Sequence, residues 1–189
     1  MKSLYFLFIL IIFYGCNNTE EDKNISKEIK KNYIDKSEHF LLTNSSKREL
    51  NISIKGSDIF SVNNITEKIV LINIFSSWCK PCMGQIPYLA EIQKIESKDL
   101  LIIGLTVNDD KSSKQLDSIF QNSGIRYFIS TSKDNKILVD KIIKQLKLTK
   151  NFSIPLSIIY KEGKLFRYYE GAMPMEMLQI EIKNAKKLL

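Results

Sequence analysis

The sequence predicts an α/β protein in which a sheet with parallel strands is buried between helices. Two apolar runs, Ile69–Phe75 and residues 100–107, are rich in β-branched side chains, as is typical of central strands covered on both faces. Residues 79–93 carry apolar side chains at a helical spacing, which indicates the crossover that two parallel strands need. The chain has 189 residues, of which 44% are hydrophobic and 26% charged, so we expect one globular domain with an appendage.

Further elements flank this unit. Residues 39–43 and 50–54 alternate apolar and polar side chains around a turn-like segment at 44–47, which predicts a β-hairpin. We expect a loop around Asn63 and Asn64 to lead into the first buried strand. Beyond the second buried strand the pattern predicts a helix over 112–122, a strand over 127–130 and a helix over 136–148. A strand over 157–160 follows, with a hairpin turn over 161–164 and a further strand to Tyr169. The last helix is expected from Pro174.

The residues that indicate chemistry follow the first buried strand as Trp78-Cys79-Lys80-Pro81-Cys82. A helix that begins near Cys79 offers unpaired amide groups and the positive end of its dipole to an anion, so we expect Cys79 to be more acidic than a free thiol. Its thiolate is the species that attacks a disulfide, and Cys82, within one turn, can resolve the mixed disulfide that results. Pro81 suits a first helical turn, where its missing N–H is not needed, and Lys80 adds a cation beside the thiolate.

A zinc site is the alternative interpretation of two cysteines at this spacing. Structural zinc needs four ligands, and beyond the pair the chain offers Cys16 and His39, both far upstream. The position of His39, the only histidine, indicates an ordinary residue at a strand end. We therefore expect no metal and no other cofactor, because a strand–turn–helix context favours a redox pair.

These residues resemble the thioredoxin fold. The resemblance rests on the string WCKPC after a buried strand, on Pro87 eight residues beyond Cys79, and on Ser153-Ile154-Pro155-Leu156 ahead of a strand and a hairpin. It implies that Cys79 is the nucleophile, that Cys82 is the resolving cysteine, and that Pro87 kinks the long helix.

The same resemblance assigns roles to the second motif and to the rim of the site. It implies that Pro155 is cis and faces the two cysteines, a minority state for a bond before proline. The Ile154 backbone would pair with an extended segment of the substrate. Trp78 would shield the rim of the site and give it its shape.

An extra strand and helix between the second core strand and Pro155, together with the N-terminal hairpin, narrow the resemblance to the membrane-tethered bacterial thioredoxins of the TlpA and ResA type. For residues 38–189 this implies a thioredoxin-like three-layer α/β/α sandwich with an N-terminal β-hairpin and a central strand–helix insert. No segment is long enough for the all-helical domain that interrupts the fold of the oxidase DsbA.

Two positions depart from these families. Asn73 stands six residues before Cys79, where thioredoxin has a buried aspartate, and Gln85 stands three residues after Cys82, where ResA-like reductases have a glutamate. A buried carboxylate can take the proton from the resolving thiol. The two amides therefore imply that water or another group is the base for Cys82.

Residues 1–15 indicate a lipoprotein-type signal peptide. A lysine near the start precedes an apolar stretch over 4–14, which is shorter than the about 20 residues that a membrane-spanning helix needs. The segment that ends in Cys16 resembles a bacterial lipobox, although Phe13 and Tyr14 stand where leucine and a small residue are usual. The resemblance implies that Cys16 is acylated and anchors the protein, with an uncleaved anchor or simple secretion as alternatives.

Residues 16–37 are polar and charged, which predicts a flexible tether. Asn24 lies in a segment that resembles an acidic sequon of bacterial N-glycosylation. The sequence is rich in asparagine and serine, and such a chain also produces this pattern by chance.

Taken together, these features predict an exported, lipid-anchored thiol–disulfide oxidoreductase of the bacterial periplasm or cell envelope. By the resemblance its clients are disulfide-containing proteins, its direction is reductive with electrons from a membrane thiol carrier, and it would serve cytochrome c maturation. An oxidase or isomerase of the same fold is the alternative. The net charge of +7 comes from lysines spread without interleaved aromatic residues, so we expect no nucleic-acid partner.

A copper-handling module is a further hypothesis. Met173, Met175 and Met177 alternate at the start of the last helix, and their thioethers, with the thiolates of Cys79 and Cys82, are soft ligands for Cu(I). Methionines at a helix start are more often packing residues or a rim that contacts a client.

Overall fold

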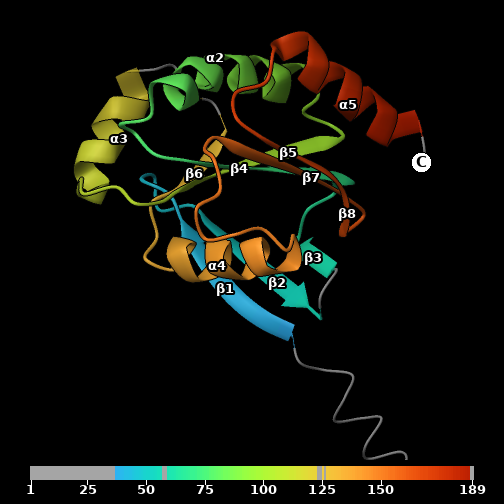
Figure 1. Cartoon of the computed structure of the whole chain (residues 1–189), viewed down its shortest axis with the longest axis horizontal. Coiled ribbons are helices and arrows are strands. Elements are labelled where there is room, and N and C mark those ends of the chain that lie inside the picture. Colours follow the sequence, from blue (N-terminus) through green and yellow to red (C-terminus); the bar gives the residue numbers. More distant parts are fainter. Residues whose placement is uncertain (1–36, 57–58, 123–124, 126, 188–189) are drawn as a thin grey trace, which may run out of the picture. The chain divides into compact units, whose positions relative to one another are not determined.

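The strand that precedes the two cysteines lies inside an eight-stranded sheet (Figure 1). The computed structural model describes residues 37–56, 59–122, 125 and 127–187. The expected signal peptide (1–15), Cys16, Asn24 and all but the last residue of the expected tether (16–37) lie outside the described residues. Within the part that is described, no helix combines the length and the apolar character needed to cross a membrane.

The strand order of the sheet is β1-β2-β3-β8-β7-β4-β5-β6. β4 (Ile69–Phe75) pairs in parallel with β5 (Leu100–Thr106) and antiparallel with β7 (Leu156–Lys161), and every residue of β4 and β5 is buried. The two apolar runs are therefore the parallel, doubly covered strands that the sequence predicts. The remaining strands are β1 (Ser37–Thr43), β2 (Glu49–Lys55), β3 (Ile59–Val62), β6 (Phe128–Ser130) and β8 (Lys164–Glu170).

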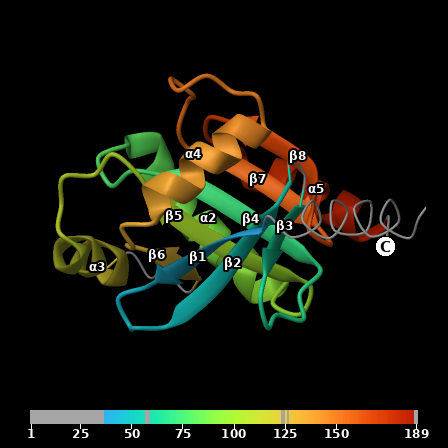
Figure 2. The same ribbon diagram turned by 90° about the horizontal axis from the view of Figure 1, so that it is seen from below.

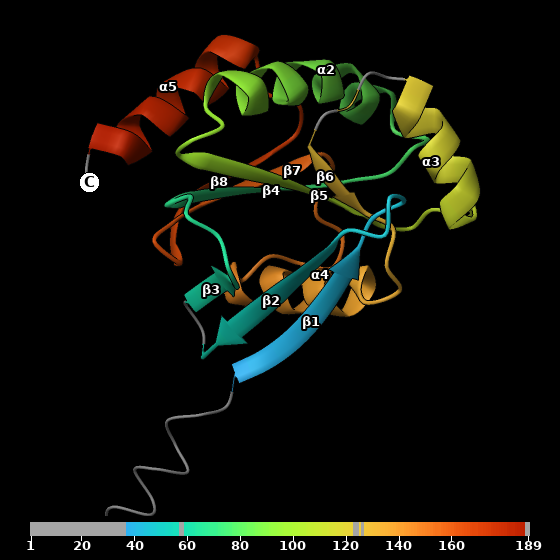
Figure 3. The ribbon, with the colours of Figure 1, turned by 180° about the vertical axis from the view of Figure 1, so that it is seen from behind.

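Helices cover both faces of the central strands. α2 (Lys80–Ile95) and α5 (Met175–Lys187) lie on one face and α4 (Asn135–Gln145) on the other (Figure 1). The side chains of β4 alternate accordingly, since Leu71 packs in a cluster with residues of α2 and α5, and Ile72 in a cluster with residues of α4. The predicted three-layer α/β/α sandwich is confirmed. α3 (Ser113–Asn122) lies beside the N-terminal end of α2 (Figure 3).

The predicted N-terminal hairpin is formed by β1 and β2, which pair antiparallel over seven positions. Their buried side chains join the same apolar cluster as α4, and Figure 2 shows the hairpin and α4 on the same side of the central strands β4, β5 and β7. The Thr131 N–H donates to the Thr43 carbonyl at 3.1 Å, and Lys141 pairs with Glu38 at 2.7 Å. The hairpin thus shares the lower layer of the sandwich with α4.

The expected loop around Asn63 and Asn64 is confirmed, but it follows a strand that the sequence analysis missed, β3 over residues 59–62. β3 pairs with β2 along its length and meets β8 at Ile59 and Lys164. The Phe60 N–H donates to the Gly163 carbonyl at 2.8 Å, and Gly163 has a φ of +80° in the turn between β7 and β8. A Cβ at Gly163 would lie 3.0 Å from the Phe60 carbonyl oxygen, so this contact requires a glycine. β3 therefore pairs on one side with the preceding strand β2 and on the other with the distant turn that leads into β8.

The helix expected over 136–148 ends earlier, at Gln145. Lys147 adopts a φ of +55°, its N–H donates to the Lys144 carbonyl, and the Leu148 N–H donates to the Ile143 carbonyl. This pair of hydrogen bonds around a left-handed residue is a Schellman motif, which ends a helix. The apolar pattern continues through Leu146 and Leu148, and a lysine stands where a glycine would signal the end, so the pattern alone overestimates the length.

The predicted strand–helix insert consists of β6 and α4, which a buried asparagine ties to β5. The Asn135 amide donates to the carbonyls of Ser130 at 2.8 Å and of Thr106 at 3.1 Å, and its oxygen accepts from the Ser130 hydroxyl at 2.6 Å. Buried amides with a full set of partners stabilise one arrangement of their surroundings. The insert therefore holds a fixed position at the end of β5.

Candidate active site

The two cysteines lie where β4 gives way to α2. β4 ends at Phe75, and Cys79 is the N-cap of α2, as the sequence predicts for a helix that begins near this residue. The Cys79 carbonyl accepts the first helical hydrogen bond, from the Met83 N–H at 3.0 Å. The Cys79 sulfur accepts from the Cys82 N–H at 3.2 Å, so it occupies the place that a capping oxygen takes in other helices. Pro81 lies in the first turn.

Cys79 and Cys82 are joined by a disulfide. Their exposure differs, since Cys79 is 6% exposed and Cys82 1% exposed. Lys80 and Pro81 are exposed, and Trp78 is 59% exposed beside them. Both cysteines are buried, and Cys79 is the less covered of the two, so a partner molecule would meet Cys79 first.

The Ile154–Pro155 peptide bond is cis, as predicted. The segment that contains it lies against the redox pair, with the Ile154 carbonyl oxygen 3.9 Å from the Cys79 sulfur. Ile154 also packs on the apolar cluster that contains both cysteines, together with Phe75 and Ile86. The fold thus brings together the two motifs on which the resemblance to thioredoxin rests.

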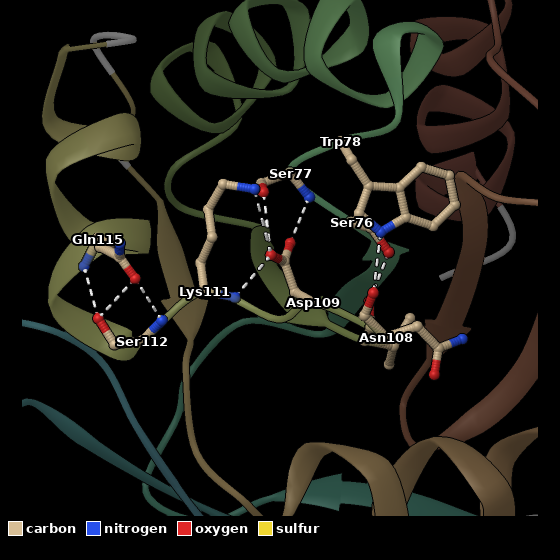
Figure 4. Close-up of polar contacts among 9 residues, drawn as sticks. Ser76, Ser77, Trp78, Asn108, Asp109, Lys111, Ser112 and Gln115 are labelled. Atoms are coloured by element: carbon tan, nitrogen blue, oxygen red, sulfur yellow. Dashed lines mark hydrogen bonds and ion pairs between the residues drawn. The ribbon is translucent and has the colours of Figure 1, made fainter.

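The loop between β4 and Cys79 is held by the residues that follow β5 (Figure 4). The Asp109 carboxylate accepts from the Ser77 N–H at 2.6 Å and from the Ser77 hydroxyl at 3.1 Å. The indole N–H of Trp78 donates to the Asn108 carbonyl at 2.8 Å, and the Ser76 hydroxyl donates to the Val107 carbonyl. Consecutive residues of one loop are therefore bound to consecutive residues of the other.

Asp109 is the residue of this site that the sequence analysis missed. Its side chain is only 4% exposed and lies 3.7 Å from the Lys111 ammonium. The available signal was its position directly after a buried strand that is parallel to β4, because the carboxyl ends of parallel strands meet at one edge of a sheet. Polar residues there face the loop that carries the cysteines.

We expect Asp109→Ala to destabilise the protein by about 1–3 kcal/mol, because the Ser77 N–H and hydroxyl lose a charged hydrogen-bond acceptor. Urea unfolding measures the change. The neighbouring carboxylate of Asp110 is exposed, so Asp110→Ala is the matched control and should change stability by less than about 0.5 kcal/mol. Equal losses from both variants would contradict this account of the loop.

The two positions that depart from the families are both buried amides. Asn73 donates to the Ser157 hydroxyl at 3.4 Å across β4 and β7. Gln85 is 3% exposed, and neither its oxygen nor its nitrogen has a hydrogen-bond partner among the described residues. Tyr127 packs on the cysteine cluster, and burial raises its pKa above the usual range, so it stays protonated and does not serve as a base.

Gln85→Met should stabilise the disulfide form by about 1 kcal/mol, because the substitution removes a buried amide without partners and conserves volume. Gln93 provides a matched control on the same helix, since its amide donates to the Leu100 carbonyl at 2.8 Å and accepts from the Ile102 N–H at 2.6 Å. Gln93→Met should cost about 1–3 kcal/mol in the same urea titration. A comparable loss at Gln85 would show that its amide is satisfied.

The other candidate ligands lie elsewhere. The His39 ring is exposed on β1 and exchanges hydrogen bonds with the hydroxyls of Ser37 and Ser53. Met173 and Met175 pack in the cluster formed with α5, not in the cluster of the cysteines, and Met177 is exposed. Among the residues described, no three histidine, cysteine, aspartate or glutamate side chains gather where they could hold a metal ion.

The sheet, the helix-capping cysteine and the cis-proline segment define a class, the thioredoxin-fold thiol–disulfide oxidoreductases of the TlpA and ResA type. Residues 52–189 match the Redoxin family, and the chain belongs to it. The chain is similar to the thiol-disulfide oxidoreductase ResA of Bacillus cereus, with 24% identity over 97% of this chain and 96% of the relative. The activity of the protein is accordingly that of a protein disulfide oxidoreductase.

Solved structures agree on the fold. StoA from Bacillus subtilis is similar with a TM-score of 0.56 and 16% identity, covering 77% of this chain and 96% of the other. A thiol:disulfide interchange protein of the thioredoxin family from Chlorobium tepidum has a TM-score of 0.63 and 18% identity, covering 78% and 92%. At such identities the likeness concerns the fold alone.

Proposed function

We propose that the protein reduces disulfides in exported proteins through a cycle of Cys79 and Cys82. The observation that carries the proposal is a disulfide at a helix start in which Cys79, the less covered of the two cysteines, lies beside the Ile154 carbonyl. The thiolate of Cys79 attacks one sulfur of the client disulfide, forming a mixed disulfide and releasing the other client sulfur as a thiolate. The thiolate of Cys82 then attacks the Cys79 sulfur, which forms the Cys79–Cys82 disulfide and releases the second client sulfur as a thiolate. Two electrons pass from the dithiol to the client, whose two sulfurs take up protons.

The local geometry gives each residue a distinct part in this cycle. The N–H of Cys82 points at the Cys79 sulfur, an arrangement that stabilises a thiolate there. Cys82 is buried against Cys79, so its first accessible electrophile is the mixed disulfide. Trp78, Lys80 and Pro81 form the exposed rim. The backbone at Ile154 and cis-Pro155 would align an extended client segment.

Cys79→Ser should reduce the rate of insulin reduction by dithiothreitol to that of dithiothreitol alone, because the one other cysteine among the described residues, Cys82, is more deeply buried. Cys82→Ser should accumulate a mixed disulfide between Cys79 and the client, visible on a non-reducing gel. The control is Cys16→Ser, which removes the third cysteine of the chain and should retain the full rate. Unchanged turnover in the Cys79→Ser variant would contradict the cycle.

The direction we propose is reductive, with a membrane thiol carrier as the source of electrons. Disulfide-containing proteins of the envelope are the proposed clients, with apocytochromes c as the class that the resemblance favours. Asn73 and Gln85 supply no carboxylate at the buried cysteine, so water or another group is the proton acceptor for Cys82 in this mechanism.

Equilibration with glutathione tests the direction. A reductase should have a midpoint potential near the thioredoxin value of about −270 mV, whereas a value near the about −120 mV of strongly oxidising relatives would identify an oxidase. The Asp110→Ala variant is the control for the assay, because it removes an exposed carboxylate, retains both cysteines, and should have the potential of the unaltered protein.

We further propose that the domain spanning 38–189 is held at the bacterial envelope by residues 1–37, with 1–15 as the signal peptide, acylated Cys16 as the anchor and 16–37 as the tether. Two acyl chains on one cysteine give stable membrane binding.

Cys16→Ser should move the protein from the membrane fraction to the soluble fraction and abolish labelling with radioactive palmitate. Cys79→Ser, which alters a cysteine of the redox pair, should leave both readouts unchanged. A Cys16→Ser protein that remains in the membrane fraction would point to an uncleaved anchor.

A further inference from the structure

A hollow of about 580 Å³ lies against α4, and apolar side chains form part of its lining. Val139 and Ile143 of α4 belong to the main apolar cluster, and Phe152 packs against that cluster from the segment that leads to Ile154. Apolar side chains in the lining of an open hollow favour a partner that brings an apolar side chain of its own.

The rim of the hollow carries an excess of positive charge. Lys136, Lys144, Lys150 and Asp140 line it, a net of two positive charges. Lys136 and Asp140 pair at 3.6 Å. Among the described residues, neither Lys144 nor Lys150 takes part in an ion pair, and both are exposed. The charge that complements this rim is negative.

Two of the residues that line the hollow, Asn108 and Phe152, lie close to the redox site. Asn108 lines the hollow and also accepts the indole N–H of Trp78 (Figure 4). On the other side, Phe152 lines it and stands two residues before Ile154, whose carbonyl lies against the Cys79 sulfur. An extended chain advances about 3.3 Å per residue. A client segment that pairs with Ile154 would therefore reach the hollow within a few residues of its reacting cysteine.

We propose that this hollow binds the client segment next to the reacting cysteine and selects segments that combine acidic residues with an apolar side chain. The inference rests on the proposed function, because it names the class of client that the Cys79 site prefers. The apolar part of the lining takes the apolar side chain, while Lys144 and Lys150 attract the carboxylates and speed encounter.

The test uses the reduced full-length protein and two peptides that each hold one cysteine capped with 2-nitro-5-thiobenzoate. In one peptide the residues after the cysteine are leucine and two glutamates, and in the other they are leucine and two lysines. Release of the coloured thiol gives the rate. The glutamate peptide should react about tenfold faster than the lysine peptide, and the ratio should fall as salt is added.

The Lys144→Glu/Lys150→Glu double variant should abolish or reverse this preference. The matched control is Lys94→Glu/Lys98→Glu, which changes the net charge equally near the far end of α2, about 20 Å along the helix from Cys79, and should retain the preference. All variants should react equally fast with the small neutral disulfide 4,4′-dithiodipyridine, which reports an intact redox pair.

Equal rates for the two peptides, or an equal loss of preference in both double variants, would overturn the inference. A further result would also overturn it. If the Lys144→Glu/Lys150→Glu variant keeps the preference for the glutamate peptide but alone loses binding to phosphatidylglycerol vesicles, the two lysines serve to bind a membrane surface. Failure of the proposed function is distinct from all of these outcomes, since the reduction of insulin would then persist in the Cys79→Ser variant.

Discussion

β4 places side chains in all three apolar clusters of the described domain. Leu71 packs with α2 and α5, Ile72 and Ile74 pack with α4 and the hairpin, and Phe75 packs with the two cysteines. Each of these side chains is fully buried, and such burial contributes about 1.5–3 kcal/mol per residue. A shift of the strand by one residue would exchange its two faces. The end of β4, and with it the position of Cys79, is fixed by this constraint.

The site itself is assembled from chain segments that are distant in sequence. The loop after β5 binds the loop that carries Ser77 and Trp78 through polar contacts, and the cis-proline segment approaches Cys79 from the other side. Beneath them the cysteines rest on apolar side chains such as Phe75 and Ile86. These contacts on three sides fix the positions of both cysteines, with Cys82 more deeply buried than Cys79.

The local sequence pattern was sufficient to predict the buried strands and the turn that follows the first of them. The runs that became β4 and β5 have both the composition and the length of buried strands, and the serines after Phe75 mark the turn to α2. The cis bond at Pro155 came from the resemblance alone, because nothing in the local residues distinguishes it from a trans bond.

The features that the sequence analysis missed depend on contacts between segments that are separate in the sequence, or on a residue with an unusual backbone conformation. β3 is a strand because β2 and the turn at Gly163 are beside it. The contact of Asp109 with Ser77 spans 32 residues, and a polar triplet after a strand otherwise indicates only a turn. The sequence analysis placed the end of α4 too late, because Lys147 adopts the left-handed conformation that is usually marked by a glycine in the sequence.

The unequal cover of the two sulfurs has a consequence for chemical damage. Peroxide reaching the reduced pair meets Cys79 first and converts it to a sulfenic acid, which can progress to irreversible sulfinic and sulfonic acids. The thiol of Cys82 lies within bonding range and displaces water from that sulfenic acid, which regenerates the disulfide of the ordinary cycle. One molecule of peroxide thus oxidises the dithiol to the disulfide and causes no irreversible modification. The arrangement of the two cysteines that allows disulfide exchange therefore also protects the protein from oxidation.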